Sequence, residues 1–116
     1  MKILILPKSL IRYANFDDYR YIDGELVVSV ADMGNEFYTK LVLIHALVEE
    51  MLTNAKGIKE EDISKFDAEH MLSEEPGLEI DAPYKEQHLI AEGIERILCA
   101  AAGINWKDYE KAFDEK

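Results

Sequence analysis

The chain has 116 residues, 24 of them acidic and 13 basic, and its formal net charge is −11. This length suits one domain, 1–116, and the 48% apolar content is that of a folded chain rather than a disordered one. The charge argues against nucleic acid as a ligand, because phosphate binding needs clustered Lys and Arg. It favours a multivalent cation or a basic protein partner, or else serves only solubility.

The cysteine content and the apolar runs bear on the cellular compartment. Cys99 is the single cysteine, so no intrachain disulfide can form, and its apolar neighbours predict a buried thiol. The apolar run 3–6 is too short for a secretory signal and stops at Pro7. The run 41–48 is far short of a membrane span. We therefore expect a cytoplasmic protein that does not contact a membrane.

The first third of the sequence predicts β-structure. Residues 2–6 are apolar and β-branched, and Pro7 ends the strand because proline cannot donate to a ladder. Asp23-Gly24 is a strong tight-turn signal, so 20–31 is predicted to be a β-hairpin.

The remaining two thirds predict helices. The first long helix spans 36–55, with Asn35 as its N-cap and Gly57 as its terminator. One or two short helical turns follow in 59–74, and Pro76-Gly77 and Pro83 place a loop at 75–83. The second long helix spans 84–102 before Gly103, and a short one spans 106–113. The predicted fold class is α+β, a small antiparallel N-terminal sheet packed on two long helices plus one or two short helices.

Each long helix carries an apolar stripe at helical spacing, which predicts its buried face. On the first helix the stripe is Phe37, Leu41, Ile44, Val48, Met51, Leu52 and Ala55. On the second helix it is Ile90, Ile94, Ile97, Leu98 and Ala101. The first helix is apolar around most of its circumference, which is typical of a helix covered on more than one side.

Each of the three histidines is followed by a glutamate four residues later: His45 by Glu49, His70 by Glu74, and His88 by Glu92. This spacing puts both side chains of a pair on one side of a helix. Imidazole and carboxylate are standard ligands of zinc and other first-row metals. The prediction is a divalent-metal site, with zinc as one choice, formed by His45, Glu49, His88 and Glu92. Ordinary hydrogen-bonded pairs are the alternative.

The helix around the first pair carries a family resemblance. After a hairpin, the chain reads Val42-Leu43-Ile44-His45-Ala46-Leu47-Val48-Glu49-Glu50, which resembles the core of the zincin metalloproteases over roughly residues 20 to 56. It also looks like small bacterial and prophage proteins with a similar helix.

The zincin resemblance implies a role for several positions. His45 matches the first metal ligand, Glu49 stands where the second histidine belongs, and His88 is a candidate third ligand. Ala46 stands where the family has its general-base glutamate, and alanine cannot take a proton from a metal-bound water. The resemblance therefore implies a metal-binding domain that is a divergent or an inactive hydrolase.

Two other functions compete with this one. The first is a non-enzymatic acidic module that docks onto a basic protein partner. The second is a magnesium-dependent nucleotide hydrolase, suggested by the spacing of Glu92 and Glu95. It requires three or four carboxylates that converge between helices; Asp67 and Asp81 are further candidates near a cleft.

Overall fold

The computed structural model describes residues 1–73 and 75–116, and in these residues the protein folds as an α+β domain. Three strands, β1 (Lys2–Leu6), β2 (Asp17–Ile22) and β3 (Glu25–Ala31), form one sheet. The α-helices are α1 (Glu36–Ala55), α2 (Glu60–Glu69), α3 (Lys85–Ala102) and α4 (Trp106–Asp114). Short 3-10 helices occupy Lys8–Leu10, Arg12–Ala14 and Pro76–Leu78.

The sheet is mixed, and the prediction of an antiparallel sheet is wrong for one strand. The hairpin is confirmed, with β2 antiparallel to β3 and a turn at Asp23-Gly24, where both residues have positive φ. β1, however, pairs with β3 in parallel, and the strand order is β1-β3-β2. The two 3-10 helices after β1 reverse the chain before β2, so β1 and β2 run in opposite directions. β3 lies between them, antiparallel to β2 and therefore parallel to β1.

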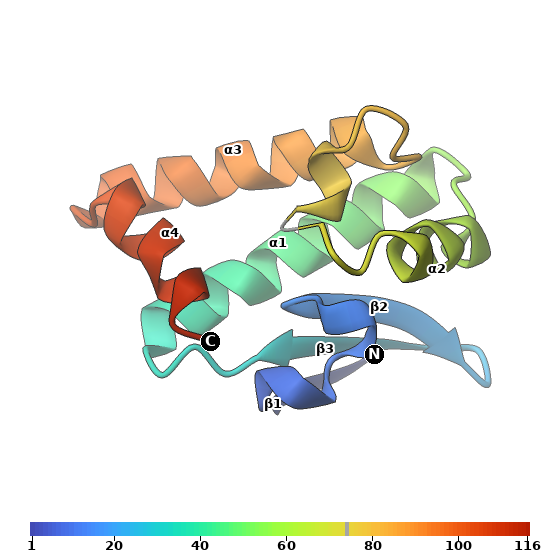
Figure 1. The fold of residues 1–116 in the computed structure, drawn as a ribbon, viewed down its shortest axis with the longest axis horizontal. Helices are drawn as coiled ribbons and strands as arrows, with labels where there is room; N and C mark the ends of the chain where they lie inside the picture. Colours follow the sequence, from blue (N-terminus) through green and yellow to red (C-terminus); the bar gives the residue numbers. More distant parts are fainter. Residues whose placement is uncertain (74) are drawn as a thin grey trace.

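The two long helices and the sheet form three successive layers (Figure 1). α1 contacts β2 and β3 on one side and α3 on the other, so α1 is the central helix of the domain. α2 and α4 lie at opposite ends of this stack (Figure 1). The predicted Asn35 cap is confirmed, since its side chain accepts a hydrogen bond from the backbone N–H of Tyr38, and Gly103 ends α3 in the left-handed conformation.

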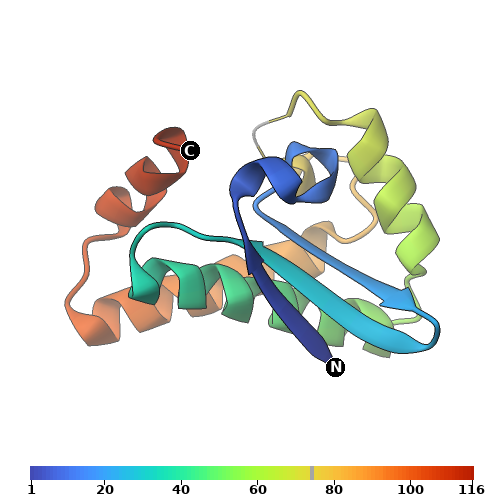
Figure 2. The same ribbon diagram turned by 90° about the horizontal axis from the view of Figure 1, so that it is seen from below.

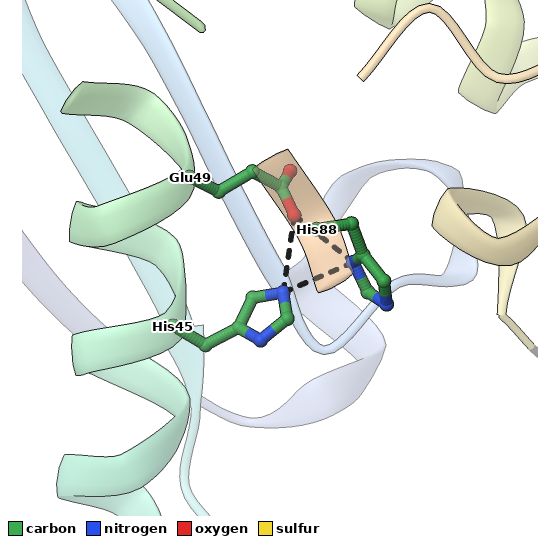
Figure 3. Close-up of side chains that lie close together, drawn as sticks. All are labelled: His45, Glu49 and His88. Atoms are coloured by element: carbon green, nitrogen blue, oxygen red, sulfur yellow. Dashed lines mark hydrogen bonds and ion pairs between the residues drawn. The ribbon is translucent and has the colours of Figure 1, made fainter. Parts of the chain in front are cut away.

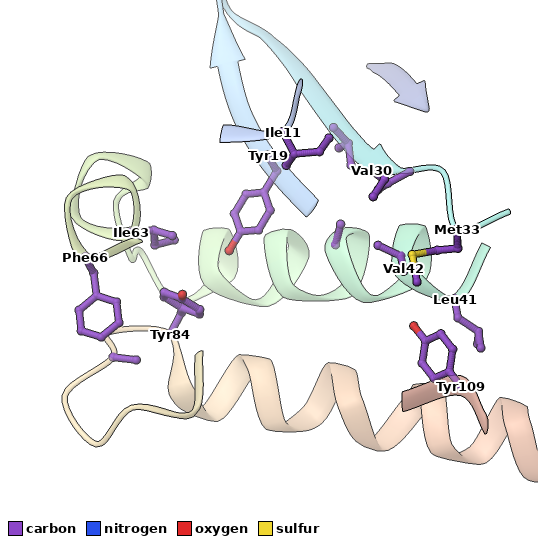
Figure 4. Packing of buried hydrophobic residues seen from close by; sticks show 14 of the residues in the cluster. Ile11, Tyr19, Val30, Met33, Leu41, Val42, Ile63, Phe66, Tyr84 and Tyr109 are labelled. Atoms are coloured by element: carbon purple, nitrogen blue, oxygen red, sulfur yellow. The ribbon is translucent and has the colours of Figure 1, made fainter. Parts of the chain in front are cut away.

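The main hydrophobic cluster lies between the sheet and α1 and continues toward α2 and α4 (Figure 4). Val28 and Val30 on the helix-facing side of β3 are fully buried, as are Leu41 and Ala46 on α1. Tyr109 of α4 closes the far end of the cluster. These contacts bury the hairpin against one face of α1 only.

The predicted apolar stripes are in large part not the buried faces of their helices. Met51 is 63% exposed, and on α3 Ile90 is 45% and Ile97 is 68% exposed. Leu41 of the predicted α1 stripe is buried as expected, and the other buried residues of α1 are Thr39, Val42, His45, Ala46, Glu49, Glu50 and Thr53. The faces that α1 and α3 turn into the domain thus carry a polar network, which periodicity of apolar residues does not reveal.

Candidate metal centre

Three side chains from the two long helices converge between α1 and α3 (Figure 3). His45 and Glu49 lie one turn apart on α1, and His88 lies at the start of α3. The Nε2 atom of His45 lies 3.1 Å from Oε2 of Glu49 and 3.1 Å from Nδ1 of His88. The Nδ1 atom of His88 lies 3.0 Å from the same glutamate oxygen. The three atoms form a nearly equilateral triangle.

The size of this triangle suits a metal ion. Zinc binds nitrogen and oxygen ligands at about 2.0–2.1 Å, so tetrahedral ligand atoms stand roughly 3.3 Å apart. Separations of 3.0 and 3.1 Å therefore need only a small expansion to accept an ion. All three side chains are largely buried, with exposed fractions of 10% for His45, 6% for Glu49 and 14% for His88.

His45 and Glu49 each form a further hydrogen bond through the atom that lies outside the triangle. The Nδ1 atom of His45 lies 2.7 Å from Oε2 of Glu95, and the hydroxyl of Tyr109 donates to the other oxygen of Glu95 at 2.6 Å. The hydroxyl of Tyr19 donates to Oε1 of Glu49 at 2.8 Å. His45 and Glu49 thus each contribute one atom to the triangle, while the second nitrogen of His45 and the second oxygen of Glu49 are hydrogen-bonded to other residues. The ligands of natural metal sites are held in the same way.

His88 is positioned by packing. The 3-10 helix Pro76–Leu78 lies against its ring, and a Cβ placed on Gly77 would lie 2.4 Å from Cγ of His88. Only glycine allows this approach, because real Cβ atoms do not come so close. The Nε2 atom of His88 is buried without a hydrogen-bond partner among the described residues, and Oε1 of Glu75 lies 3.8 Å away.

Burial and the neighbouring charges shift the pKa values of His45, His88 and Glu49. Burial by itself would lower the pKa of His45, but hydrogen bonds to Glu49 and Glu95 outweigh it and raise the pKa well above 6.5. In the same way, Glu49 and Glu75 raise the pKa of His88 to about 9 against the effect of burial. Burial acts to raise the pKa of Glu49, yet the two histidines bring it to about 2. Without a metal ion, the cluster therefore holds protons on its histidines.

A cavity of about 830 Å³ adjoins the cluster, and further carboxylates line it. Asp17 and Tyr19 pair with Val30 and Val28, so both project from the helix-facing side of the sheet. Asp17 makes no side-chain hydrogen bond among the described residues, and burial raises its pKa to about 7.

Asp67 of α2 lines the same cavity. It accepts hydrogen bonds from the hydroxyl of Tyr84 and from Nδ2 of Asn15, and burial raises its pKa to about 6. With Asp17, Glu49 and Glu95, it is among the carboxylates that line this cavity.

The structure brings together three of the four predicted ligands. Glu92 lies apart from the triangle, on another side of His88, where it groups with His88 and Glu75 and accepts a long 3.4 Å bond from Arg96. Asp81 is exposed on the surface.

The third histidine pair falls outside the cluster. Nδ1 of His70 lies 2.8 Å from the carbonyl oxygen of Phe66, and its ring stacks on the Phe66 ring. Glu74 lies outside the described residues.

Several residues of the site were not predicted as part of it. Glu95 is the main example, although a signal was present, because it follows His88 by seven residues and so lies on the same face of α3. Tyr19, Tyr109 and Asp17 come from other elements, and nothing in the sequence near His45 points to them. Gly77 falls in the predicted loop 75–83, and nothing in the sequence indicates its contact with His88.

The described arrangement has the chemistry of a cation site with room beside it. Two neutral imidazole nitrogens and one carboxylate oxygen suit zinc and other first-row divalent ions. The neighbouring cavity could admit water and a small molecule. Nowhere in residues 1–73 and 75–116 is there a helix with the length and apolar character of a membrane span.

Comparisons of this chain with protein-family models, with curated proteins and with solved structures found no match.

Proposed function

We propose that this protein binds one divalent metal ion through Nε2 of His45, Oε2 of Glu49 and Nδ1 of His88. The observation that carries the proposal is the mutual spacing of these atoms, 3.0 to 3.1 Å, in a buried site. A cation would bind all three atoms at once and replace the protons on the histidines. The Glu95 contact supports the same assignment, because an Nδ1–H that donates to a carboxylate leaves the Nε2 lone pair of His45 free for a metal.

The donor set favours zinc, and iron or manganese come next. Two nitrogens and one oxygen are the ligand set of many catalytic zinc sites, which keep a fourth position for water. Magnesium and calcium are less favoured, because both prefer oxygen ligands. The acidic cavity, which also contains Asp17, Asp67 and Glu95, contributes an electrostatic field that attracts a cation.

The finer form of the proposal is a zincin-like hydrolase. It is supported by a central helix that carries two ligands one turn apart and packs beside a hairpin. Ala46 is fully buried against the core and cannot act as a base. We assign that role to Asp17, whose carboxylate lines the cavity and is without a hydrogen-bond partner in the described chain. The base would accept a proton from a metal-bound water.

The experiment that tests metal binding is elemental analysis of protein purified without an affinity tag or chelator. Near-stoichiometric zinc, iron or manganese is expected in the native protein and should be lost in a His45→Ala/Glu49→Ala variant. His70→Ala is the matched control, since His70 lies outside the cluster and should leave the metal content unchanged. Circular dichroism of each variant checks that the fold persists.

Two results would contradict the proposal. One is a native protein that binds no metal even after reconstitution with each of the three ions. The other is metal that remains in the double variant. Either result would leave the histidines as members of a structural network and would favour the acidic module that docks onto a basic protein.

A further inference from the structure

The carboxylates of Glu75 and Glu92 form a second group with His88, next to the triangle. Oε1 of Glu75 lies 3.8 Å from Nε2 of His88, and Glu92 follows His88 by about one turn of α3. One ligand atom from each of these three residues lies within 4.8 Å of the others. The group is more open than the triangle, because the Glu75 side chain is 54% exposed, although that of Glu92 is only 17% exposed.

His88 faces the two groups with different nitrogens. Its Nδ1 atom belongs to the triangle, 3.0 Å from Glu49 and 3.1 Å from His45. Its Nε2 atom lies on the side of the ring away from these two residues (Figure 3). There it is buried and has no hydrogen-bond partner among residues 1–73 and 75–116. A neutral imidazole that offers its Nδ1 lone pair to a metal carries its proton on Nε2, so this N–H would be left buried without an acceptor.

The fold places both carboxylates near this nitrogen. The 3-10 helix Pro76–Leu78 packs against α3 at the end of the domain that carries α2 (Figure 1, Figure 2). Gly77 allows this short helix to touch the His88 ring, so Glu75, which directly precedes the helix, is held beside Nε2. Glu92 reaches the same place along α3, because residues four apart share one side of a helix.

Arg96 is the competing partner of Glu92. Its Nη2 atom lies 3.4 Å from Oε1 of Glu92, its side chain is 55% exposed, and its guanidinium lies over the Trp106 ring. An exposed ion pair of this length contributes little free energy. It also uses only one carboxylate oxygen, so the other oxygen of Glu92 is available to a cation.

We propose that His88 bridges two divalent ions, the first in the triangle and the second bound by Nε2 of His88 and the carboxylates of Glu75 and Glu92. The proposal rests on the function proposed above, since the first ion binds Nδ1. When the second ion binds, the Nε2 proton passes to water and the ring becomes an imidazolate that donates one lone pair to each ion. Metal–nitrogen bonds of about 2.0–2.1 Å put the two ions roughly 6 Å apart. Rotation of the exposed Glu75 side chain closes the present gap.

The charges of the ligands match those of two ions. The ions bring four positive charges, and Glu49, Glu75, Glu92 and the imidazolate bring four negative ones. The ligands therefore offset the repulsion between the ions. The mixed nitrogen and oxygen donors suit zinc in the second position as in the first. Because the second group is the more open one, we expect it to bind zinc more weakly and to fill after the triangle.

The test is the zinc content of the chelator-treated full chain after equilibrium dialysis against rising zinc concentrations. The expected result is one ion at low zinc and two at saturation. Glu75→Gln/Glu92→Gln should bind only one, because a neutral amide is a poor ligand for zinc. The matched control is Glu61→Gln/Glu69→Gln, which makes the same change in charge at two exposed positions of α2 and should still bind two.

Copper tests the bridge itself. Two Cu²⁺ ions joined by an imidazolate couple antiferromagnetically. The electron paramagnetic resonance signal should therefore grow with the first equivalent of Cu²⁺ and fall as the second binds. In Glu75→Gln/Glu92→Gln the signal of the first ion should persist when more copper is added. Circular dichroism of each variant checks that the fold is retained.

Three results would overturn the second site. They are a native protein that saturates with one zinc ion, a second zinc that remains in Glu75→Gln/Glu92→Gln, and two copper ions whose signals simply add. In the first case Glu75 would serve only to orient His88. Failure of the triangle is distinguishable from all three, because His45→Ala/Glu49→Ala would then keep the native zinc content.

Discussion

The imidazole Nδ1 of His45 lies 2.7 Å from a carboxylate oxygen of Glu95, a residue fifty positions further along the chain. The contact joins α1 to α3 and fixes which nitrogen of His45 points into the triangle. The other oxygen of Glu95 accepts a hydrogen bond from Tyr109, so the carboxylate is itself held in place by α4. The orientation of the first predicted ligand thus depends on a residue that contributes no atom to the triangle.

Replacing the carboxylate of Glu95 should weaken metal binding, although Glu95 is not one of the three proposed metal ligands. We expect Glu95→Gln to lower zinc affinity about 10- to 100-fold, because loss of the negative charge makes the imidazole a poorer ligand and relaxes its orientation. Isothermal titration calorimetry of the apo protein with zinc measures the effect. Glu69→Gln, an exposed change on α2, should leave the affinity as it was. Equal affinities for the two variants would show that Glu95 does not orient His45.

Two glycines provide a matched pair of substitutions. In Gly77→Ala the new Cβ would meet the His88 ring, which must move away, so zinc affinity should fall and the protein should lose stability. Gly93→Ala adds the same methyl group within α3, where no atom lies within 4 Å. There it should stabilise the protein by about 0.5–1 kcal/mol through helix propensity. Thermal unfolding and zinc titration of both variants separate these outcomes, and unchanged zinc affinity in Gly77→Ala would argue against His88 as a ligand.

The buried hydroxyl of Tyr19, which donates to Glu49, should contribute more to stability than the more exposed hydroxyl of Tyr21. Tyr19→Phe leaves Oε1 of Glu49 without its donor in a buried site, which should cost about 1–3 kcal/mol. Tyr21→Phe removes a hydrogen bond to Glu50 at the surface end of the same strand, where water can replace the hydroxyl. A smaller loss, at most about 1 kcal/mol, is expected there. Urea denaturation gives both values, and the prediction fails if the two losses are equal.

Stability without metal should fall as the pH rises from about 6.5 to about 9. The pKa of His88 is raised to about 9 and that of His45 is raised well above 6.5. A raised histidine pKa gives stability that is complete below the unfolded value and is lost as the pH passes the folded one. Asp17, with a pKa of about 7, acts in the same direction, because ionising it in the folded state is unfavourable. Glu49 acts oppositely, but only below pH 4.5.

Metal binding should show the opposite dependence on pH. Since the ion must displace protons from both histidines, zinc affinity should increase over the range in which apo stability declines. Urea denaturation of the apo protein and zinc titration across the same pH series provide the comparison. An affinity that is independent of pH would mean that the ion does not bind at the two histidines.

Local sequence chemistry was sufficient to predict the hairpin, both long helices and the candidate ligands on each helix. The Asp23-Gly24 turn, the Asn35 cap and the Gly103 terminator act within a few residues, so the hairpin and both long helices could be predicted from local chemistry. The i, i+4 spacing likewise put His45 and Glu49 on one face of α1. His88 was identified as a candidate partner, but nothing local could show that it would meet them.

Three further features depend on contacts between distant parts of the chain. The parallel pairing of β1 depends on how the chain reverses before β2, which no short pattern encodes. The roles of Glu95, Tyr19 and Gly77 depend on contacts between elements far apart in the chain. The buried faces of α1 and α3 mix polar with apolar residues, and hydrogen bonds within the polar network offset the cost of removing its groups from water. Periodicity shows where apolar residues recur along a helix, but which of them become buried depends on the elements that pack against that helix.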